Sequence, residues 1–387
     1  MIATRHARLA AATGALLLLV PPAAPLAQIA RGGPGMAGAG PVAVLPFVSR
    51  GTDPEAWPRL REALRLALSD HGVTLIPEEP VERELRRLRL RDMSILSHEE
   101  LADLAVAVGA RELLIGHVYR VSEEMMAVTF SGRLIDPVAR RIDALVFTAE
   151  EGHEMDGVLG SGLPVTLAGT LAAATLDFVD ALLGDLEDPI GGPKPRLLRR
   201  SPLAPTPAAF FSDGLETSRI SRILVLPFRS RVPQPGAGQA AADLVSWGFV
   251  RSGSVSVVDA GDATRRLLEK GWRTGIPVST GQILSLGLDP GVDAVLMGSV
   301  EKWVEGDPRN LKPPEIALSA RLLDARTGEI LWAADHERRG DETRMVYEIG
   351  NVRLAEELLA RASYEMIAPL LNRMEKTARK GVQGETP

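Results

Sequence analysis

The residues best suited to chemistry in this chain are its histidines, its adjacent acids and two serines that stand beside polar residues. Histidine can act as a general base or as a metal ligand, and two converging carboxylates can exchange a proton with a substrate. The six histidines are His6, His71, His98, His117, His153 and His336. They form no close pair, so the sequence contains no zinc, haem or iron motif.

The acidic residues form no catalytic pattern either. Glu99-Glu100 and Glu123-Glu124 are adjacent, and adjacent side chains point away from one another on a helix or a strand. The chain has no Gly-x-Ser-x-Gly elbow, no dinucleotide-binding glycine pattern and no calcium loop. Its lack of cysteine excludes a disulfide, a cysteine nucleophile and a lipid-modified cysteine. We therefore predict a non-enzymatic protein with no catalytic, cofactor-binding or metal-binding residues and no cofactor.

The elements that position these residues occur twice. Val42-Ala43-Val44-Leu45-Pro46-Phe47 returns as Ile223-Leu224-Val225-Leu226-Pro227-Phe228, and the segment 109–118 returns as 291–300. Such a repeat predicts two copies of one domain. The histidines do not repeat, whereas the strand-forming residues do. Functional information is therefore expected where the copies differ.

Each copy shows the same order of patterns. A continuous apolar run predicts a buried strand, an amphipathic helix follows it, and a short strand and a short helix come next. Ser97 with Glu100, and Ser279 with Gln282, predict capping boxes that begin a further helix. Three long strands complete the pattern; the first of them, 112–121 or 294–303, is apolar and then alternating, which is typical of a strand that leaves the core toward an edge.

Single residues within these strands have structural explanations. Gly116 and Gly298 lie inside predicted strands, where a glycine indicates close approach of a packed element. Asp136 and Asp324 end predicted strands and are expected to cap turns rather than to act in catalysis. The arginines between 83 and 91 are interpreted as a solvated helix face, with contact to an acidic partner as the alternative.

These patterns predict an α/β (α+β) fold of two tandem domains. Each domain is a mixed β-sheet packed with helices and closed by a long C-terminal helix, near 163–183 in the first copy and 345–373 in the second. The predicted boundaries are a signal peptide at 1–27, a flexible lead-in at 28–40, a first domain at 41–185, a Pro/Gly-rich linker at 186–217, a second domain at 218–374 and a frayed tail at 375–387.

The N-terminal segment and the composition bear on location. Arg5 and Arg8 precede an apolar run at 9–20, and small residues lead to Ala27, which is a secretory signal pattern; a retained anchor is the alternative. With a net charge of −6 and 4% aromatic residues, the chain lacks the basic surface and stacking residues of a nucleic-acid binder. We predict a periplasmic location, with no membrane span after signal cleavage.

The Val-Leu-Pro-Phe strand, the Ser-capped helix leading into Gly-Val-Asp-Ala-Val-Leu-Met-Gly-Ser-Val, and the hairpin Leu-Leu-Asp-Ala-Arg-Thr-Gly-Glu-Ile-Leu-Trp together resemble a family of periplasmic α/β domains. This family includes CsgG, LpoB-type and FlgO-type proteins and the TolB amino-terminal domain. The resemblance covers residues 222–371 and, more loosely, 41–185. Relatives are usually lipoproteins, and this chain departs from them because it has no cysteine.

The resemblance implies a secreted periplasmic scaffold or accessory protein that acts in envelope assembly or secretion by binding envelope proteins, and oligomers are compatible with it. One alternative is an oligomeric CsgG-like outer-membrane channel component, although the insert at 304–314 is too polar and proline-rich for membrane strands. The other alternative is an enzyme acting on envelope polymers. Expected contact surfaces are edge strands, the groove between copies, the 304–314 loop and Trp303, for which covering the core is the alternative role.

Overall fold

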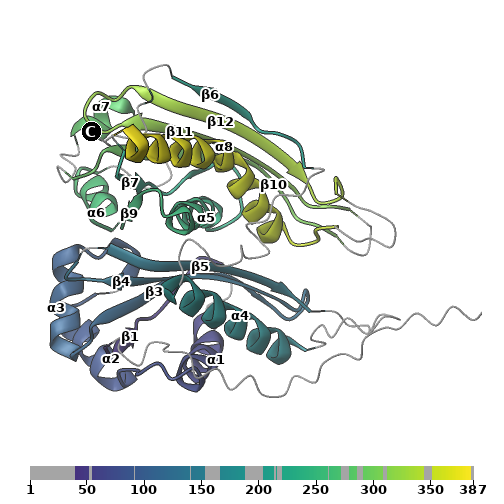
Figure 1. Cartoon of the computed structure of the whole chain (residues 1–387). Coiled ribbons are helices and arrows are strands. Elements are labelled where there is room, and N and C mark those ends of the chain that lie inside the picture. The colour runs from purple at the N-terminus through teal and green to yellow at the C-terminus, as the bar shows by residue number, and fades with distance from the viewer. Residues whose placement is uncertain are drawn as a thin grey trace, which may run out of the picture. The chain divides into compact units, whose positions relative to one another are not determined.

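The repeated Leu-Pro-Phe segments each begin a mixed β-sheet, and the two sheets have the same design (Figure 1). The computed structural model describes residues 40–51, 55–90, 92–139, 141–152, 166–187, 204–212, 215, 220–259, 261–271, 279–285, 291–307, 312–343 and 351–384. The predicted signal peptide, nearly all of the lead-in and most of the linker lie outside these residues. The two copies belong to one compact unit, Gly35–Pro387.

The first sheet has the strand order β1-β3-β4-β5. β1 (Val42–Val44) is parallel to β3 (Glu112–Ser122), which is antiparallel to β4 (Ala127–Asp136), which in turn is antiparallel to β5 (Arg141–Glu151). The predicted strand 42–47 is divided, because Pro46 has no N–H to donate and pairing resumes only at β2 (Val48–Ser49). The short strand predicted after the first helix of the first copy is reduced to a single bridge from Leu75 to Val42.

The second sheet repeats this arrangement and adds a strand at each edge. Its order is β6-β12-β11-β10-β7-β9, with β8 also pairing β10. The strands are β6 (Ala208–Phe211), β7 (Arg222–Val225), β8 (Arg229–Ser230), β9 (Ser256–Val258), β10 (Ala294–Val304), β11 (Glu315–Asp324) and β12 (Ile330–Arg339). β6 corrects the prediction of a linker over 186–217, because its Ala-Ala-Phe-Phe run pairs with the free edge of β12.

β3 and β10 lie in the middle of their sheets, not at an edge as their sequence pattern suggested. The alternation in β10 has another cause: its second half is only partly buried, whereas nearly all of β3 is buried. The two strands also share an irregularity, since the register shifts between Val118 and Arg120 and again between Val300 and Lys302. Residues with the same register in the two sheets are called twins below.

Each copy contributes helices that pack against its own sheet. The first copy has α1 (Ala56–Asp70), α2 (Glu78–Arg87), the short 3-10 helix η1 (Met93–Ile95), α3 (His98–Val108) and α4 (Leu167–Glu187). The second copy has α5 (Ala237–Ser252), α6 (Gly261–Glu269), α7 (Thr280–Ser285) and α8 (Ala355–Gly384). α1 and α4 pack together on the first sheet, and α5 and α8 pack together on the second.

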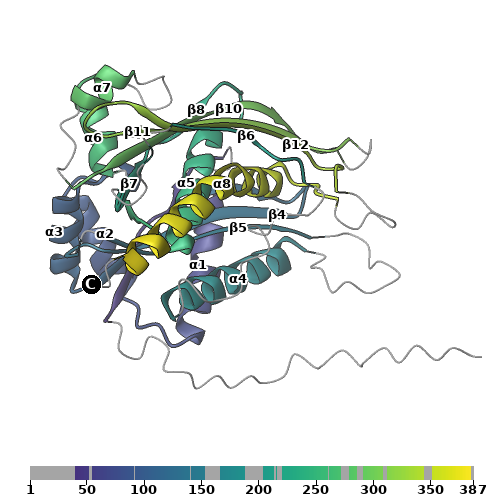
Figure 2. The ribbon, with the colours of Figure 1, turned by 45° about the horizontal axis from the view of Figure 1, so that its top comes forward.

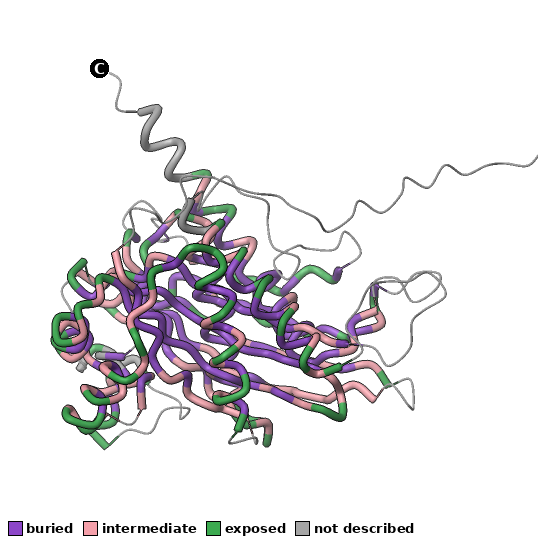
Figure 3. The backbone as a smooth tube through the Cα atoms, turned by 90° about the horizontal axis from the view of Figure 1, so that it is seen from below, coloured by how far each residue is buried: buried purple, intermediate pink, exposed green. Residues whose placement is uncertain are grey.

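α5 has a second contact that decides the arrangement of the copies. Besides β10 of its own sheet it packs against β5 of the first sheet, so it lies between the two sheets (Figures 1 and 2). Every residue of α5 from Ala240 to Phe249 is buried. Buried residues accordingly continue through the strands of both sheets (Figure 3).

The two strand glycines accommodate the phenylalanines of the repeat. A Cβ on Gly116 would lie 2.3 Å from the Phe47 ring, and a Cβ on Gly298 would lie 2.3 Å from the Phe228 ring. Both values are far below a normal carbon–carbon contact of about 3.5 Å. The predicted packing role of these glycines is confirmed.

The capping boxes and turn aspartates are also confirmed. The Ser97 Oγ accepts from the Glu100 N–H and the Glu100 carboxylate accepts from the Ser97 N–H at 2.9 Å, while Ser279 and Gln282 exchange the same two bonds. Asp136 and Asp324 each accept two backbone N–H groups of the turn that follows. These side chains are therefore used by the backbone.

The mixed α/β fold with a long C-terminal helix is as predicted. One boundary differs: α8 continues to Gly384, through most of the segment 375–387 that was expected to fray. Lys, Glu, Arg, Ala and Gln in this segment are good helix formers, so the helix extends past its last contact with the sheet.

Candidate functional site

The predicted absence of a histidine pair leaves open what each histidine does. His71 contacts Asp180 at 3.1 Å on the surface, His98 is buried at the start of α3, and His336 contacts the buried Glu365 at 3.0 Å within the second copy. His6 and His153 lie outside the described residues. His117, in contrast to His71 and His336, has its partner in the other copy.

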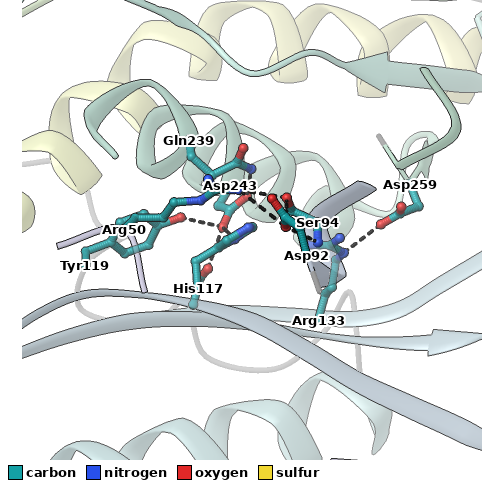
Figure 4. A network of polar contacts seen from close by, with 10 residues as sticks. Arg50, Asp92, Ser94, His117, Tyr119, Arg133, Gln239, Asp243 and Asp259 are labelled. Carbon is teal, nitrogen blue, oxygen red and sulfur yellow. Dashed lines mark hydrogen bonds and ion pairs between the residues drawn. The ribbon is translucent and has the colours of Figure 1, made fainter. Parts of the chain in front are cut away.

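Asp243, on α5, is the centre of a polar network between the copies (Figure 4). Its Oδ2 accepts from the His117 Nδ1 at 2.9 Å and the Tyr119 hydroxyl at 2.7 Å, and also from the Ser131 hydroxyl. Its Oδ1 accepts from the Gln239 amide at 2.8 Å. The first three donors come from β3 and β4 of the first copy, so one carboxylate of the second copy accepts hydrogen bonds from two strands of the first sheet.

Burial and charge fix the protonation of this network. Burial would raise the pKa of Asp243, but the His117 ring, the Arg133 charge and the Ser131 hydroxyl hold that pKa well below its usual value. Burial lowers the pKa of His117 despite the attraction of Asp243. At neutral pH the site therefore holds an ionised Asp243 and a neutral imidazole, whose Nδ1 must carry the proton because Asp243 only accepts.

A second ion pair joins the same surfaces. The Arg133 guanidinium on β4 contacts the Asp259 carboxylate at 2.6 Å, and Asp259 follows β9 of the second copy. Both side chains are nearly fully buried. Burial lowers the pKa of Arg133, but Asp259 and Asp243 raise it overall, so the guanidinium remains charged. The surface along which the two copies meet is called the join below. At its centre, the acids Asp243 and Asp259 of the second copy bind His117 and Arg133 of the first copy.

Three further ion pairs, two of them made by Arg120, lie between the copies. Arg120 on β3 contacts Glu356 on α8 at 2.7 Å and Glu305 at 2.6 Å. Arg265 on α6 contacts Glu100 on α3 at 2.6 Å. Glu356 is buried, whereas the Arg265 pair is about one-third exposed. The copies are therefore held by ionic contacts along much of their common surface.

A cleft of about 550 Å³ remains beside this network. Its lining includes Arg50, His117, Arg133, Asp243 and Asp259, which combine both signs of charge. The buried His117 Nε2 has no hydrogen-bond partner among the described residues. His117 itself is among the residues that line the cleft.

An Asp-His pair invites comparison with a catalytic triad, but the geometry differs. In a triad the nucleophilic hydroxyl donates to the histidine nitrogen that faces away from the aspartate. Here the Ser131 hydroxyl donates to Asp243 itself. The Tyr119 hydroxyl does the same, and burial raises its pKa well above the usual value. The arrangement therefore stabilises a buried carboxylate and activates neither hydroxyl.

The twin positions of the second sheet show that this network is not part of the repeat. Register places Ser299 at the position of His117, Ser319 at that of Ser131, Arg321 at that of Arg133 and Asp335 at that of Phe147. Glu301 stands at the position of Tyr119, in the shared register shift. On the outer face of the second sheet, Ser319 and Arg321 can thus donate hydrogen bonds as Ser131 and Arg133 do in the first sheet. Two acids stand there in place of two aromatic residues.

The sequence holds two signals of this network, although neither predicts it by itself. Asp243 is the one charged residue in the otherwise small and apolar segment 237–250. His117 and Ser299 also differ between copies, although the glycine before them and the valine after them are the same in both strands. A lone acid in an apolar helix together with an unmatched histidine in a buried strand indicates a buried pair.

Trp303 and the start of the 304–314 loop make contacts within the chain, whereas the sequence suggested them as contact residues for a partner. Trp303 packs against the core, and its indole N–H donates to Glu305 at 2.9 Å. Because Glu305 also binds Arg120 of the first copy, this segment helps hold the copies together. The interpretation of Trp303 as a residue that covers the core is confirmed, and residues 308–311 of the loop lie outside the described residues.

Two other features of the described residues concern metals and membranes. No three His, Asp or Glu side chains in the described ranges lie close enough to hold a metal ion. In the same ranges, the segment Leu167–Gly184 of α4 is long and apolar enough to cross a membrane by length and composition. α4 packs against β4, β5 and α1, as the core helix of a folded domain does.

No protein-family model and no curated protein sequence matches the chain. Similarity to solved structures is detectable over parts of it. A PelC dodecamer from Paraburkholderia phytofirmans is 18% identical, covers 44% of this chain and 96% of its own, with a TM-score of 0.29. A lipoprotein from Neisseria meningitidis is 19% identical, covers 40% and 96%, with a TM-score of 0.27.

The LpoB C-terminal domain from Salmonella enterica is 16% identical and covers 33% of this chain and 87% of its own, with a TM-score of 0.22. Each of these structures spans less than half of the present chain. Similarities with such low identities and TM-scores are too weak to indicate a function.

Proposed function

We propose that this chain is a non-enzymatic scaffold or accessory protein of the bacterial envelope that acts by binding other envelope proteins. One observation carries the proposal: the residues most capable of chemistry, His117 and Asp243, are used to join two copies of a domain. The signal pattern and the resemblance of the repeat to periplasmic α/β domains support the envelope location.

The contact with a partner is proposed to lie at β6. This strand ends the second sheet, and only its β12 side is paired with a strand among the described residues. Three of its four residues are exposed, including Phe210, whose side chain is 58% exposed. An unpaired edge with an exposed aromatic side chain favours addition of an extended segment from another protein.

A photo-crosslinking amino acid at position 210, in cells that are then fractionated, tests this proposal. The same amino acid at Val106, which is 80% exposed on α3, is the matched control. The proposal predicts that the crosslinked product lies in the envelope fraction and that a defined envelope protein is captured at 210 and not at 106. Recovery of the chain in the cytosol, or identical products from both positions, would contradict it.

The enzyme alternative remains testable because of the His117-Asp243 pair and the adjacent cleft. If the pair acted on an envelope polymer, replacement of His117 by Gln would abolish turnover while leaving the chain folded, because Gln can still donate to Asp243. The scaffold proposal predicts that the same variant retains envelope-partner capture at position 210.

A further inference from the structure

The join between the copies brings together two different surfaces. The first copy contributes the outer face of its sheet, with His117, Ser131 and Arg133, and the second contributes the outer side of α5, with Asp243. A contact between unlike surfaces can be repeated, because each unit retains one unused surface of each kind. In this chain the unused surfaces are the outer face of the second sheet and the outer side of α1.

The outer face of the second sheet keeps the arginines of the join. Arg321 is the twin of Arg133, since the two residues pair with Met297 and Ile115 at the same register. Arg231 is the twin of Arg50, because their N–H groups donate to the equivalent Val300 and Val118 carbonyls, at 3.0 and 2.7 Å.

These twins border a groove in that face. The groove measures about 310 Å³, and Arg231, Arg321 and Met297 are among its lining residues. Arg321 is exposed and has no ionic or hydrogen-bonding partner within the described part of the chain, whereas Arg133 is bound to Asp259. The unused sheet face therefore presents a free guanidinium group where the join uses a paired one.

The outer side of α1 keeps the matching acid. Phe47 and Phe228 are followed at the same spacing by Glu62 and Asp243, and again by the positive-φ glycines Gly72 and Gly253 that end the two helices. Glu62 thus occupies the position of Asp243, and Leu66 occupies that of the buried Trp247.

Both residues of α1 are accessible. Glu62 is exposed and has no partner within the described ranges, and the Leu66 side chain is 62% exposed. An exposed leucine beside a free carboxylate complements a groove that is lined by arginines and by Met297.

We propose that the outer face of the second sheet binds the outer side of α1 of a second copy of this chain, head to tail. Glu62 of one molecule faces Arg321 and Arg231 of the next, and Leu66 enters the groove beside Met297. In this contact, as in the join within one molecule, the outer face of one sheet packs against a helix of another copy of the domain. It goes beyond the envelope role, because it needs no other protein.

Two substitutions weaken this contact relative to the join. Glu301 and Asp335 stand where the first sheet has Tyr119 and Phe147, and the Glu301 carboxylate already accepts from Ser299 and pairs with Arg231 at 3.0 Å. The incoming Glu62 must compete with Glu301 for these groups. The association is consequently reversible and weakened by salt, whereas the buried join stays closed.

Sedimentation of the purified chain over a range of concentrations tests the proposal. We expect the average mass to rise with concentration above the 41.4 kDa of one chain and to fall back at about 0.5 M salt, where screening is stronger. Glu62→Arg and Arg321→Glu should each raise the dissociation constant about tenfold or more, and the double variant should restore much of the association.

Glu99→Arg on α3 and Arg326→Glu in the β11–β12 turn change charge equally at other exposed positions and should leave the association unchanged. A single-chain mass at every concentration would overturn the proposal, as would an equal effect of the interface and control variants.

The absence of native cysteines provides a direct test of direction. A mixture of the single variants Glu62→Cys and Arg321→Cys should form the mixed disulfide-linked dimer under mild oxidation, because the two positions face each other between molecules. A symmetric association would instead link each variant to itself, and that outcome would contradict the head-to-tail arrangement.

Discussion

The His117 Nδ1 lies 2.9 Å from the Asp243 Oδ2, although the two residues are 126 positions apart and belong to different copies of the repeat. This contact turns a tandem repeat into one unit. It depends on residues that the copies do not share, since the twin of His117 is Ser299 and the equivalent of Asp243 is the exposed Glu62.

Replacing Asp243 by Ala should destabilise the whole chain. The His117, Tyr119 and Ser131 donors would lose their acceptor while remaining buried, and removal of one partner from a buried ionic network typically costs about 3–5 kcal/mol. Denaturant unfolding in dilute solution measures this loss. Glu62→Ala removes the equivalent exposed acid and should change the free energy of unfolding by less than about 0.5 kcal/mol. Equal losses in the two variants would refute the assignment.

The exposed ion pair between the copies should matter far less. Arg265 and Glu100 are about one-third exposed, and such pairs contribute roughly 0–1 kcal/mol. Arg265→Ala should therefore lower the free energy of unfolding by less than about 1 kcal/mol, and the loss should shrink further in high salt. If Arg265→Ala lowered the free energy of unfolding as much as Asp243→Ala does, the join would depend on its exposed ion pair and not on its buried network.

The join also predicts a loss of stability in acid. Burial lowers the pKa of His117, and Arg133 and Arg50 lower it further, so the unfolded chain takes up a proton that the folded chain refuses. The contribution of His117 to stability should be complete above the ordinary histidine pKa of 6.5 and should be lost as the pH drops below it.

Asp243 acts in the same direction at lower pH. Its lowered pKa gives a contribution that is complete above the ordinary value of 3.8 and is lost as the pH falls through the folded-state pKa. Thermal unfolding from about pH 8 to about pH 3 measures both steps. His117→Gln should abolish the first step and reduce the second, which Arg133 and Ser131 still support; an unchanged profile between about pH 6.5 and pH 5 would show that another group is responsible.

The strand glycines should not tolerate a side chain. Gly298→Ala would place a methyl group against the Phe228 ring and the Ser319 carbonyl, and overpacking of this kind costs about 1–3 kcal/mol. Gly184, near the end of α4, has nothing within 4 Å of an added Cβ, so Gly184→Ala should stabilise by up to about 1 kcal/mol. The melting temperature should therefore fall for Gly298→Ala and rise for Gly184→Ala. An unchanged melting temperature for Gly298→Ala would refute the packing role of this glycine.

Much of the fold could be predicted because its determinants are local. The capping box at Ser97, the turn at Asp324 and the glycine opposite Phe228 each depend on neighbouring or repeated residues, and the repeat supplied an internal comparison. β6 could not be predicted, because its pairing depends on the free edge of β12 rather than on its own short sequence.

The candidate site was harder to predict because it depends on how the copies pack. Tyr119 and Asp243 are 124 residues apart, and no local pattern determines which sheet face a neighbouring helix covers. The two signals that were present, a lone acid in an apolar helix and an unmatched histidine, identify a buried partner but not its location.

We infer that Asp243 joins the two copies into one cooperative unit. Hydrogen exchange measured by mass spectrometry at increasing denaturant can test this cooperativity, because it follows β3 and β4 separately from β10 and β11. We expect the protected amides of both sheets to open together in the natural chain and separately in Asp243→Ala. Opening of the first sheet at lower denaturant in the natural chain, with the second sheet still protected, would contradict it.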